Sequence, residues 1–162
     1  METPDDLSAL EVEVIDLFVG GVRALGLPKS IGEIYGLLYV SPEPLHLDRL
    51  IQRLRISRGS ASQGVRFLRN LGAIQTNYIP GDRRDHYVAV AELKKLVSGF
   101  LESEIQPHLL SGKERLHHLG RTLTKNKGDR ETAAFLKGRV DQLRKWHRWA
   151  NQVVPMVKGF LG

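Results

Sequence analysis

The stretch SRGSASQGVRFLRNLG, residues 57–72, decides the fold that this sequence predicts. Its apolar residues recur at helical spacing and Gly72 follows the last of them, which predicts a helix over residues 57–71. At 100° per residue, one side of this helix is apolar and carries Ala61, Val65 and Leu68. The opposite side and its flanks are polar and carry Arg58, Ser62, Gln63, Arg66, Arg69 and Asn70. One side can therefore pack inward while the other presents polar side chains outward.

The periodicity of the sequence changes after this helix. Residues 73–79, AIQTNYI, alternate and are rich in β-branched side chains, which predicts a strand. The triplet Pro80-Gly81-Asp82 indicates a turn, and residues 86–90 form the returning strand. The result is a β-hairpin with PGDRRD at its tip, so that Arg83 and Arg84 lie in solvent.

Three helices are predicted before residue 57. The first covers about residues 7–25 and ends at Gly26-Leu27-Pro28. We place its inward stripe on Leu7, Leu10, Val14, Leu17, Phe18, Gly21, Val22 and Leu25. The second begins with Ser30 as its N-cap and ends before Pro42. The third spans residues 45–54 and turns Leu47, Leu50, Ile51 and Leu54 inward. Short helices, then a helix with a polar face, then a hairpin: this order predicts a winged helix-turn-helix.

The last third of the chain is predicted to be helical. An apolar stripe from Leu93 to Ile105 predicts a helix that ends at Pro107, and a second helix carries Leu116, Leu119 and Leu123. A last helix from about Asp129 aligns Leu136, Val140, Leu143, His147, Ala150 and Val154, with Pro155 near its end. We therefore expect a mainly α fold with a small β-hairpin, in three segments. These are an N-terminal helix (1–27), a winged helix-turn-helix domain (28–91) and a C-terminal helical region (92–162).

The composition excludes several classes of protein. The 162 residues include no cysteine, which excludes disulfide scaffolds, thiolate zinc sites and cysteine nucleophiles. No run of about 18 apolar residues exists, so we expect no membrane partner. The first residues, METPDDLSALEVEV, are acidic and lack the order of a signal peptide. We therefore expect a cytoplasmic protein.

Positive charge is concentrated where the polar helix and the hairpin lie. The whole chain carries 24 Lys+Arg and 18 Asp+Glu, for a net charge of +6. Between Arg49 and Arg84 there are eight arginines, no lysine and one acidic residue, Asp82. Arginine presents a planar fork that suits phosphate and guanine. A further net charge of +7 in residues 91–162 is not explained by this pattern.

These features predict a surface that binds DNA. The N-terminal half of the polar helix would contact base edges in the major groove, and a narrow minor groove would attract arginines at the hairpin tip. The candidate DNA-binding residues are Ser57, Arg58, Ser60, Ser62, Gln63, Arg66 and Arg69 on the helix, and Arg83 and Arg84 on the hairpin. For the helix, an ordinary solvated polar face is the alternative interpretation. For the hairpin, the alternative is a loop that is charged for solubility.

Residues 24–90 resemble the GbsR-like branch of the MarR-type transcriptional regulators. The resemblance rests on Gly26-Leu27-Pro28, the helix Ile34–Pro42, the segment Ser57–Ser62 and the wing Pro80–Arg84. Arg58 stands where the family commonly has lysine, which keeps the positive charge. The resemblance implies a homodimeric repressor that binds double-stranded DNA at a pseudo-palindromic operator. It also implies dimerisation through the helix near residues 92–105 and the last helix, with the N-terminal helix as a further candidate.

The same resemblance suggests a small-molecule effector such as a quaternary amine. Trp146 and Trp149, with Tyr35 and Tyr39, are candidates for an aromatic cage around such a cation. Aromatic residues at helical spacing usually face a core or a dimer interface, and basic residues surround the two tryptophans. We therefore favour packing for these four residues.

The sequence offers no motif for catalysis, a cofactor or a metal. The serines between 57 and 62 lack the context of a catalytic nucleophile, and the glycines form no phosphate-binding fingerprint. His117 and His118 are adjacent and diverge by about 100° on a helix, whereas metal pairs use positions i and i+4. We predict that the protein is not an enzyme. Two alternatives stay open: a winged-helix module that binds an acidic protein, and a winged helix that binds RNA.

Overall fold

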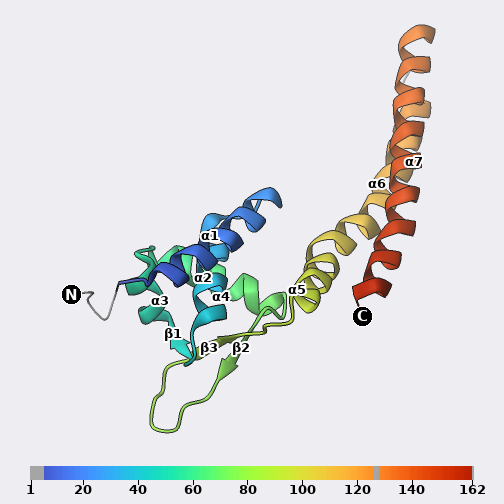
Figure 1. The fold of residues 1–162 in the computed structure, drawn as a ribbon. Coiled ribbons are helices and arrows are strands. Elements are labelled where there is room, and N and C mark those ends of the chain that lie inside the picture. Colours follow the sequence, from blue (N-terminus) through green and yellow to red (C-terminus); the bar gives the residue numbers. More distant parts are fainter. Residues whose placement is uncertain (1–5, 126–127, 162) are drawn as a thin grey trace. The chain divides into compact units, whose positions relative to one another are not determined.

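The computed structural model describes residues 6–125 and 128–161, and the chain divides into two compact units, Met1–Gly99 and Phe100–Gly162 (Figure 1). The elements of the first unit are α1 (Ala9–Ala24), α2 (Lys29–Val40), β1 (Leu45–His46), α3 (Leu47–Leu54), α4 (Arg58–Asn70), β2 (Ile74–Asn77) and β3 (His86–Ala89). Helix α5 (Leu93–Phe100) follows and ends one residue past the boundary. After it come a π-helical turn, η1 (Leu101–Ile105), and the helices α6 (Gln106–Lys125) and α7 (Arg130–Leu161). The chain is mainly helical with a small antiparallel sheet, which confirms the predicted fold class.

Helices α1 and α2 pack closely because two glycines of α2 have no side chain and let the backbone of α1 approach. A Cβ atom on Gly32 would lie 2.7 Å from the Cα atom of Val19, and one on Gly36 would lie 2.8 Å from the Cα atom of Ile15. Ile15 and Val19 are accordingly the buried residues of α1. The predicted inward stripe is wrong for Leu10, Leu17 and Leu25, which are 65%, 72% and 54% exposed. The glycine surface of α2 selects the other apolar face of α1.

The start of α2 also differs from the prediction. Pro28 is the N-cap residue, with no capping side chain, and the helix begins at Lys29. Ser30, predicted as the cap, lies in the first helical turn and is half-buried. The fixed φ of proline, here −58°, is suited to the entry of a helix without a side-chain cap. The helix ends as predicted, because Ser41 is extended ahead of Pro42.

The sheet has three antiparallel strands in the order β1-β3-β2. The predicted hairpin is β2 and β3, which pair from Ile74↔Ala89 to Asn77↔His86. Strand β1 was not predicted: residues 45 and 46 belong to it, and α3 starts two residues later than expected. It pairs with β3 at Leu45↔Tyr87 and His46↔His86, so the base of the wing is held against the chain segment before α3.

The core of the first unit lies between α2, α3 and α4. Its most deeply buried side chains are Ile34, Tyr35, Leu37, Leu50, Ala61 and Leu68. Helix α4 rests on α2 through Gly64, where a Cβ atom would lie 2.5 Å from Cδ1 of Ile34. The hydroxyl of Tyr35 donates a 2.8 Å hydrogen bond to the carbonyl oxygen of Val90, just after β3, and burial raises the pKa of this tyrosine to about 12. These contacts fix α4 and the wing on one scaffold.

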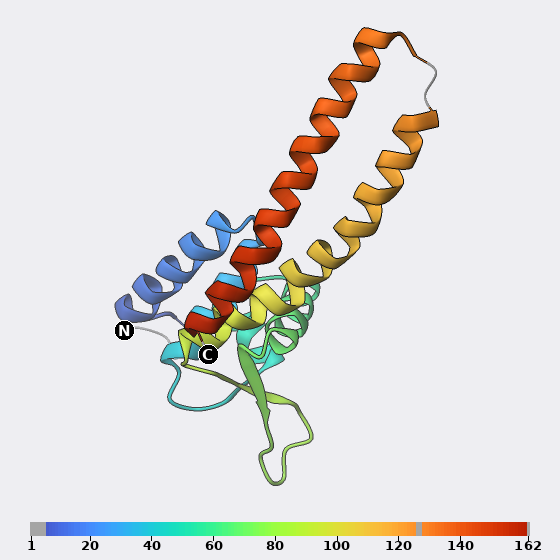
Figure 2. The same cartoon turned by 90° about the vertical axis from the view of Figure 1, so that its right-hand side faces the viewer.

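The second unit is a hairpin of two long helices, α6 and α7 (Figure 2). The prediction that a helix ends at Pro107 is wrong. Pro107 lies in the first turn of α6, directly after the π-helical turn. The first turn of a helix tolerates proline because its N–H groups have no helical acceptor. Pro155 lies inside α7, which continues to Leu161. Within the described residues, no helix combines the length and apolarity needed to span a membrane.

Candidate nucleic-acid interface

The N-terminus of α4 is organised by two serines. Ser57 is the N-cap, and its hydroxyl accepts a 3.1 Å hydrogen bond from the backbone N–H of Ser60. The two hydroxyl oxygens lie 3.0 Å apart, so the side chain of Ser60 is engaged inside the cap. A capped N-terminus carries partial positive charge and exposed N–H groups, which attract phosphate. Ser57 and Ser60 therefore shape the end of the helix that the sequence predicts to contact DNA.

Arg58 links the two helices of the helix-turn-helix. Its Nη2 lies 2.5 Å from Oδ1 of Asp48, in the first turn of α3, while its side chain remains 70% exposed. An ion pair this exposed contributes little to stability, because water screens it and ordering two side chains costs entropy. The guanidinium can therefore leave Asp48 for a base or a phosphate at low cost.

The polar face of α4 is open to solvent. Gln63, Arg66, Arg69 and Asn70 are exposed, and Ser62 is half-buried. Ser62, Arg66, Arg69 and Asn70, with Leu47, Val65 and Tyr87, line a groove of about 470 Å³ beside β3. Burial raises the pKa of Tyr87, and the charge of Asp85 adds to this while Arg69 opposes it. The structure thus brings the predicted helix residues onto one surface, with the hydroxyl-bearing ring of Tyr87 at its edge.

The wing, residues 78–85, projects from the end of the β2–β3 hairpin (Figure 1). Gly81 has a φ of 86°, which a residue with a side chain rarely adopts, so this turn depends on glycine. Asp82 accepts from Arg84 through the backbone N–H at 3.0 Å and the side-chain Nε at 2.9 Å. These hydrogen bonds hold the pKa of Asp82 far below its ordinary value and raise that of Arg84.

Two histidines connect the wing to the strands beneath it. Nη1 of Arg84 lies 3.1 Å from Nε2 of His46, the N-cap residue of α3. Nδ1 of the buried His86 lies 3.0 Å from the carbonyl oxygen of Arg84, and the two imidazole rings meet edge to face at 5.4 Å. Burial lowers the pKa of His46, and the charge of Arg84 lowers it further. Arg84 is therefore held by three partners: its guanidinium contacts Asp82 and His46, and its carbonyl oxygen contacts His86.

Arg83 differs from its neighbour. It is exposed at the wing, and among the described residues it has no hydrogen bond or ion pair. Tyr78, at the start of the wing, is 79% exposed. Of the two predicted wing arginines, Arg83 is the one whose guanidinium is available to a ligand in this structure.

Sequence reasoning missed the acidic and histidine partners of this surface. Asp48, Asp82 and His46 each contact a predicted DNA-binding arginine, and His86 supports the wing from below. The positions of Asp82 and Arg84, two apart and directly after Pro80-Gly81, were a visible sign of such a pair. The role of His46 depends on strand β1, which has no sequence signature at two residues.

The four candidate cage aromatics fall into two pairs in different units. In the first unit, Tyr35 is buried and its ring lies 4.8 Å from that of Phe18, in contact with Tyr39. In the second, the rings of Trp146 and Trp149 meet at 5.3 Å, and both are more than half exposed. Among the described residues, no group of three metal-ligating side chains gathers.

The arrangement of α3, α4 and the wing defines a winged helix-turn-helix protein. The chain is 25% identical over 152 residues to the HTH-type transcriptional repressor GbsR of Bacillus subtilis (strain 168), covering 90% of this chain and 84% of that protein. It is 24% identical over 83 residues to the HTH-type transcriptional repressor OpcR of the same organism, covering 51% and 45%. These similarities confirm the resemblance to the GbsR-like, MarR-type regulators. No family model matches the sequence.

The fold is also found in a solved structure. A crystal structure of a transcriptional regulator superposes with a TM-score of 0.52 at 18% sequence identity, covering 90% of this chain and 96% of that one. The likeness shows that the two chains share a fold.

Proposed function

We propose that this chain is a sequence-specific DNA-binding transcriptional regulator that acts as a repressor in the cytoplasm. The observation that carries the proposal is the exposed polar face of α4, which shares one compact unit with the wing that bears Arg83. The similarity to GbsR and OpcR, both described as HTH-type transcriptional repressors, supports it.

In this proposal α4 enters the major groove. Arg58, Ser62 and Gln63, in its N-terminal half, face the base edges, where arginine and glutamine side chains distinguish base pairs. Arg66 and Arg69 lie further along the helix and take bases or phosphates. Arg83 enters the adjoining minor groove, and Arg84 joins it only if it exchanges Asp82 for a phosphate.

We further propose that the regulator is a homodimer formed through its helical regions. In the described part of the second unit, none of the side chains on η1, α6 or α7 is fully buried. Large exposed apolar side chains there include Leu110, Phe135, Leu143, Trp146, Trp149 and Phe160. Exposed apolar surface of this extent is typical of an interface, and Leu10 and Leu17 extend the same argument to α1. Two-fold symmetry then predicts a pseudo-palindromic operator with half-sites about one helical turn apart.

A binding assay tests the proposed function directly. Fluorescence anisotropy with the DNA upstream of the gene should show tighter binding than with a shuffled duplex, and the affinity should fall steeply with salt. Light scattering on the same sample should give twice the mass of one chain. Equal affinity for the shuffled duplex, or stronger binding to the RNA of the same sequence, would overturn the proposal.

An effector would act through the dimer. A small molecule can change the spacing of the two α4 helices only if it binds one arrangement more tightly than the other. Titrating choline into the protein–DNA complex tests the effector that the family resemblance suggests: release of the DNA is the expected result, and an unchanged complex would contradict a choline effector.

A further inference from the structure

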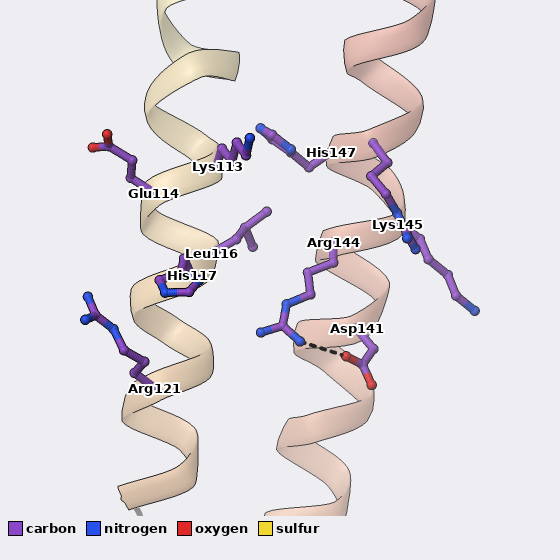
Figure 3. A pocket seen from close by; sticks show the side chains of 10 residues that line it. Lys113, Glu114, Leu116, His117, Arg121, Asp141, Arg144, Lys145 and His147 are labelled. Atoms are coloured by element: carbon purple, nitrogen blue, oxygen red, sulfur yellow. Dashed lines mark hydrogen bonds and ion pairs between the residues drawn. The ribbon is translucent and has the colours of Figure 1, made fainter.

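A cleft runs along one face of the α6–α7 hairpin in the second unit. Its volume is about 1090 Å³, and ten residues of the two helices line it (Figure 3). Figure 3 shows Lys113 and Leu116 of α6 and Arg144 and His147 of α7 pointing between the helices. Apart from Leu116, the side chains that point between the helices are therefore cationic or polar, where a two-helix hairpin would ordinarily place apolar ones.

The charge of the cleft is strongly positive. Its cationic lining residues are Lys113, Arg121, Arg144, Lys145 and Arg148, and its acidic ones are Glu114 and Asp141. Oδ1 of Asp141 is paired with Nη1 of Arg144 at 3.3 Å. Glu114, Arg121 and Lys145 point away from the gap between the helices, so Lys113 and Arg144 are the labelled cationic side chains that face it (Figure 3). A concave surface lined by one sign of charge concentrates the opposite ion. The cleft also accounts for part of the net charge of +7 in residues 91–162 that the DNA-binding surface leaves unexplained.

Two glycines of α6 make room for the polar side chains of α7. A Cβ atom on Gly112 would lie 3.0 Å from the ring of His147, and one on Gly120 would overlap the guanidinium of Arg144. His147 is fixed there, because its Nε2 donates a 2.6 Å hydrogen bond to the carbonyl oxygen of Leu109. Glycine inside a helix is unfavourable by about 1 kcal/mol relative to alanine. The two positions of α6 that contact His147 and Arg144 are therefore both glycine, at a cost to the stability of the helix.

We propose that this cleft binds a small anion, a metabolite that carries phosphate or carboxylate groups. Lys113 and Arg144 are the direct ligands, and Arg121 and Arg148 supply the surrounding positive charge. A quaternary amine is disfavoured here, because the lining is cationic and neither Trp146 nor Trp149 belongs to it. The binding site stands on the second unit alone, and its role as an effector site rests on the proposed function.

Gly120 provides a test that leaves the charge of the protein unchanged. Gly120→Ala displaces the flexible end of Arg144, which can move without disturbing the backbone, so the helix still folds. Gly138→Ala is the matched control, because its Cβ atom would meet nothing within 4 Å. Calorimetric titration of the full chain with pyrophosphate and with citrate, at constant ionic strength, measures the binding.

The proposal expects saturable binding of one anion per chain. Gly120→Ala and Arg144→Gln should each weaken it by about tenfold or more, as expected for a lost hydrogen bond to a charged group, while Gly138→Ala leaves it unchanged. Circular dichroism confirms that all variants fold.

Three results of the titrations without DNA would overturn the proposal. They are non-saturable binding of both anions, equal binding by the Gly120→Ala and Gly138→Ala variants, and saturable binding of choline that Gly120→Ala abolishes. The phosphate groups of DNA could also occupy the cleft. Duplex binding by the Gly120→Ala and Gly138→Ala variants is therefore measured in the absence of small anions. A loss of DNA affinity in Gly120→Ala alone would assign the cleft to the nucleic acid and overturn the proposal. Anion binding is measured without DNA, so failure of the proposed regulator function would leave this site standing, and failure of the site would leave that function standing.

Discussion

The guanidinium of Arg84 grips the carboxylate of Asp82 two residues earlier in the wing: Nε lies 2.9 Å from Oδ1 and Nη2 lies 2.5 Å from Oδ2. The same side chain reaches Nε2 of His46 at 3.1 Å. Adjacent arginines at a hairpin tip look equivalent in sequence, yet one ties the wing to β1 and the other extends into solvent. The two should respond differently to mutation.

Arg83→Ala should weaken DNA binding without changing the wing. The expected sign is a salt dependence whose slope is smaller by about 1, because one phosphate or minor-groove contact is lost. Anisotropy titrations at several salt concentrations measure the slope. Arg84→Ala is the comparison: it should increase hydrogen exchange of the wing amides, which Arg83→Ala leaves unchanged. An unaltered slope in Arg83→Ala would show that the wing does not touch DNA.

Arg58→Ala or Gln63→Ala should weaken binding to the specific site by about 1–3 kcal/mol each, as expected for side chains that read a base. Binding to random DNA should weaken less. Arg23→Ala, on α1, is a charge-matched control that removes one exposed arginine away from α4. Equal losses on specific and random DNA would assign these residues to the phosphate backbone instead.

Gly32→Ala should destabilise the first unit by about 1–3 kcal/mol or more. The added Cβ atom would lie 2.7 Å from both the N and the Cα of Val19, and backbone atoms cannot move aside as a side chain can. Gly20→Ala, on α1, is the control, because its Cβ atom meets nothing within 4 Å and alanine favours the helix by about 1 kcal/mol. Urea denaturation compares the two. Similar stabilities would contradict the close packing of α1 on α2.

The free energy of unfolding should fall as the pH drops below about 6.5, the ordinary pKa of histidine. Burial, and then the charge of Arg84, lower the pKa of His46 in the folded protein, whereas Asp48 and Asp82 oppose this. The unfolded chain then binds more protons than the folded one, so the stability from the neutral ring is present above this pH and lost below it. His46→Asn keeps a residue that can cap α3 and should flatten this dependence between pH 7 and 5. A profile as steep as that of the unmutated protein would assign the effect to other groups.

Local patterns predicted most of the first unit. The bounds of α4 follow from its capping serine, its apolar spacing and Gly72, which has a φ of 70°. The hairpin follows from alternation and a Pro-Gly turn. These features depend on residues that are close in sequence, so they are visible before the chain folds.

The features that were missed depend on distant partners. Strand β1 exists because residues 45 and 46 pair with β3, about 40 positions later. Leu10 and Leu17 were assigned inward because either apolar face of α1 satisfies helical spacing, and Gly32 and Gly36 select the other one. The dual attachment of Arg84 required the same long-range pairing. The candidate DNA-binding residues, which the sequence predicts by type and position, stay a prediction that the experiments above test.

Helix α4 has a sequence that would hardly be helical on its own. Its thirteen residues include Gly59 and Gly64, together with two serines, and glycine is the least favourable helix residue after proline. Gly64 is the point where the helix settles on Ile34 of α2. A synthetic peptide of these residues should be a random coil in water, since short helices gain most of their stability from packing. The candidate DNA-binding surface therefore exists only as long as α2 supports α4, and local unfolding at that contact would remove the whole surface.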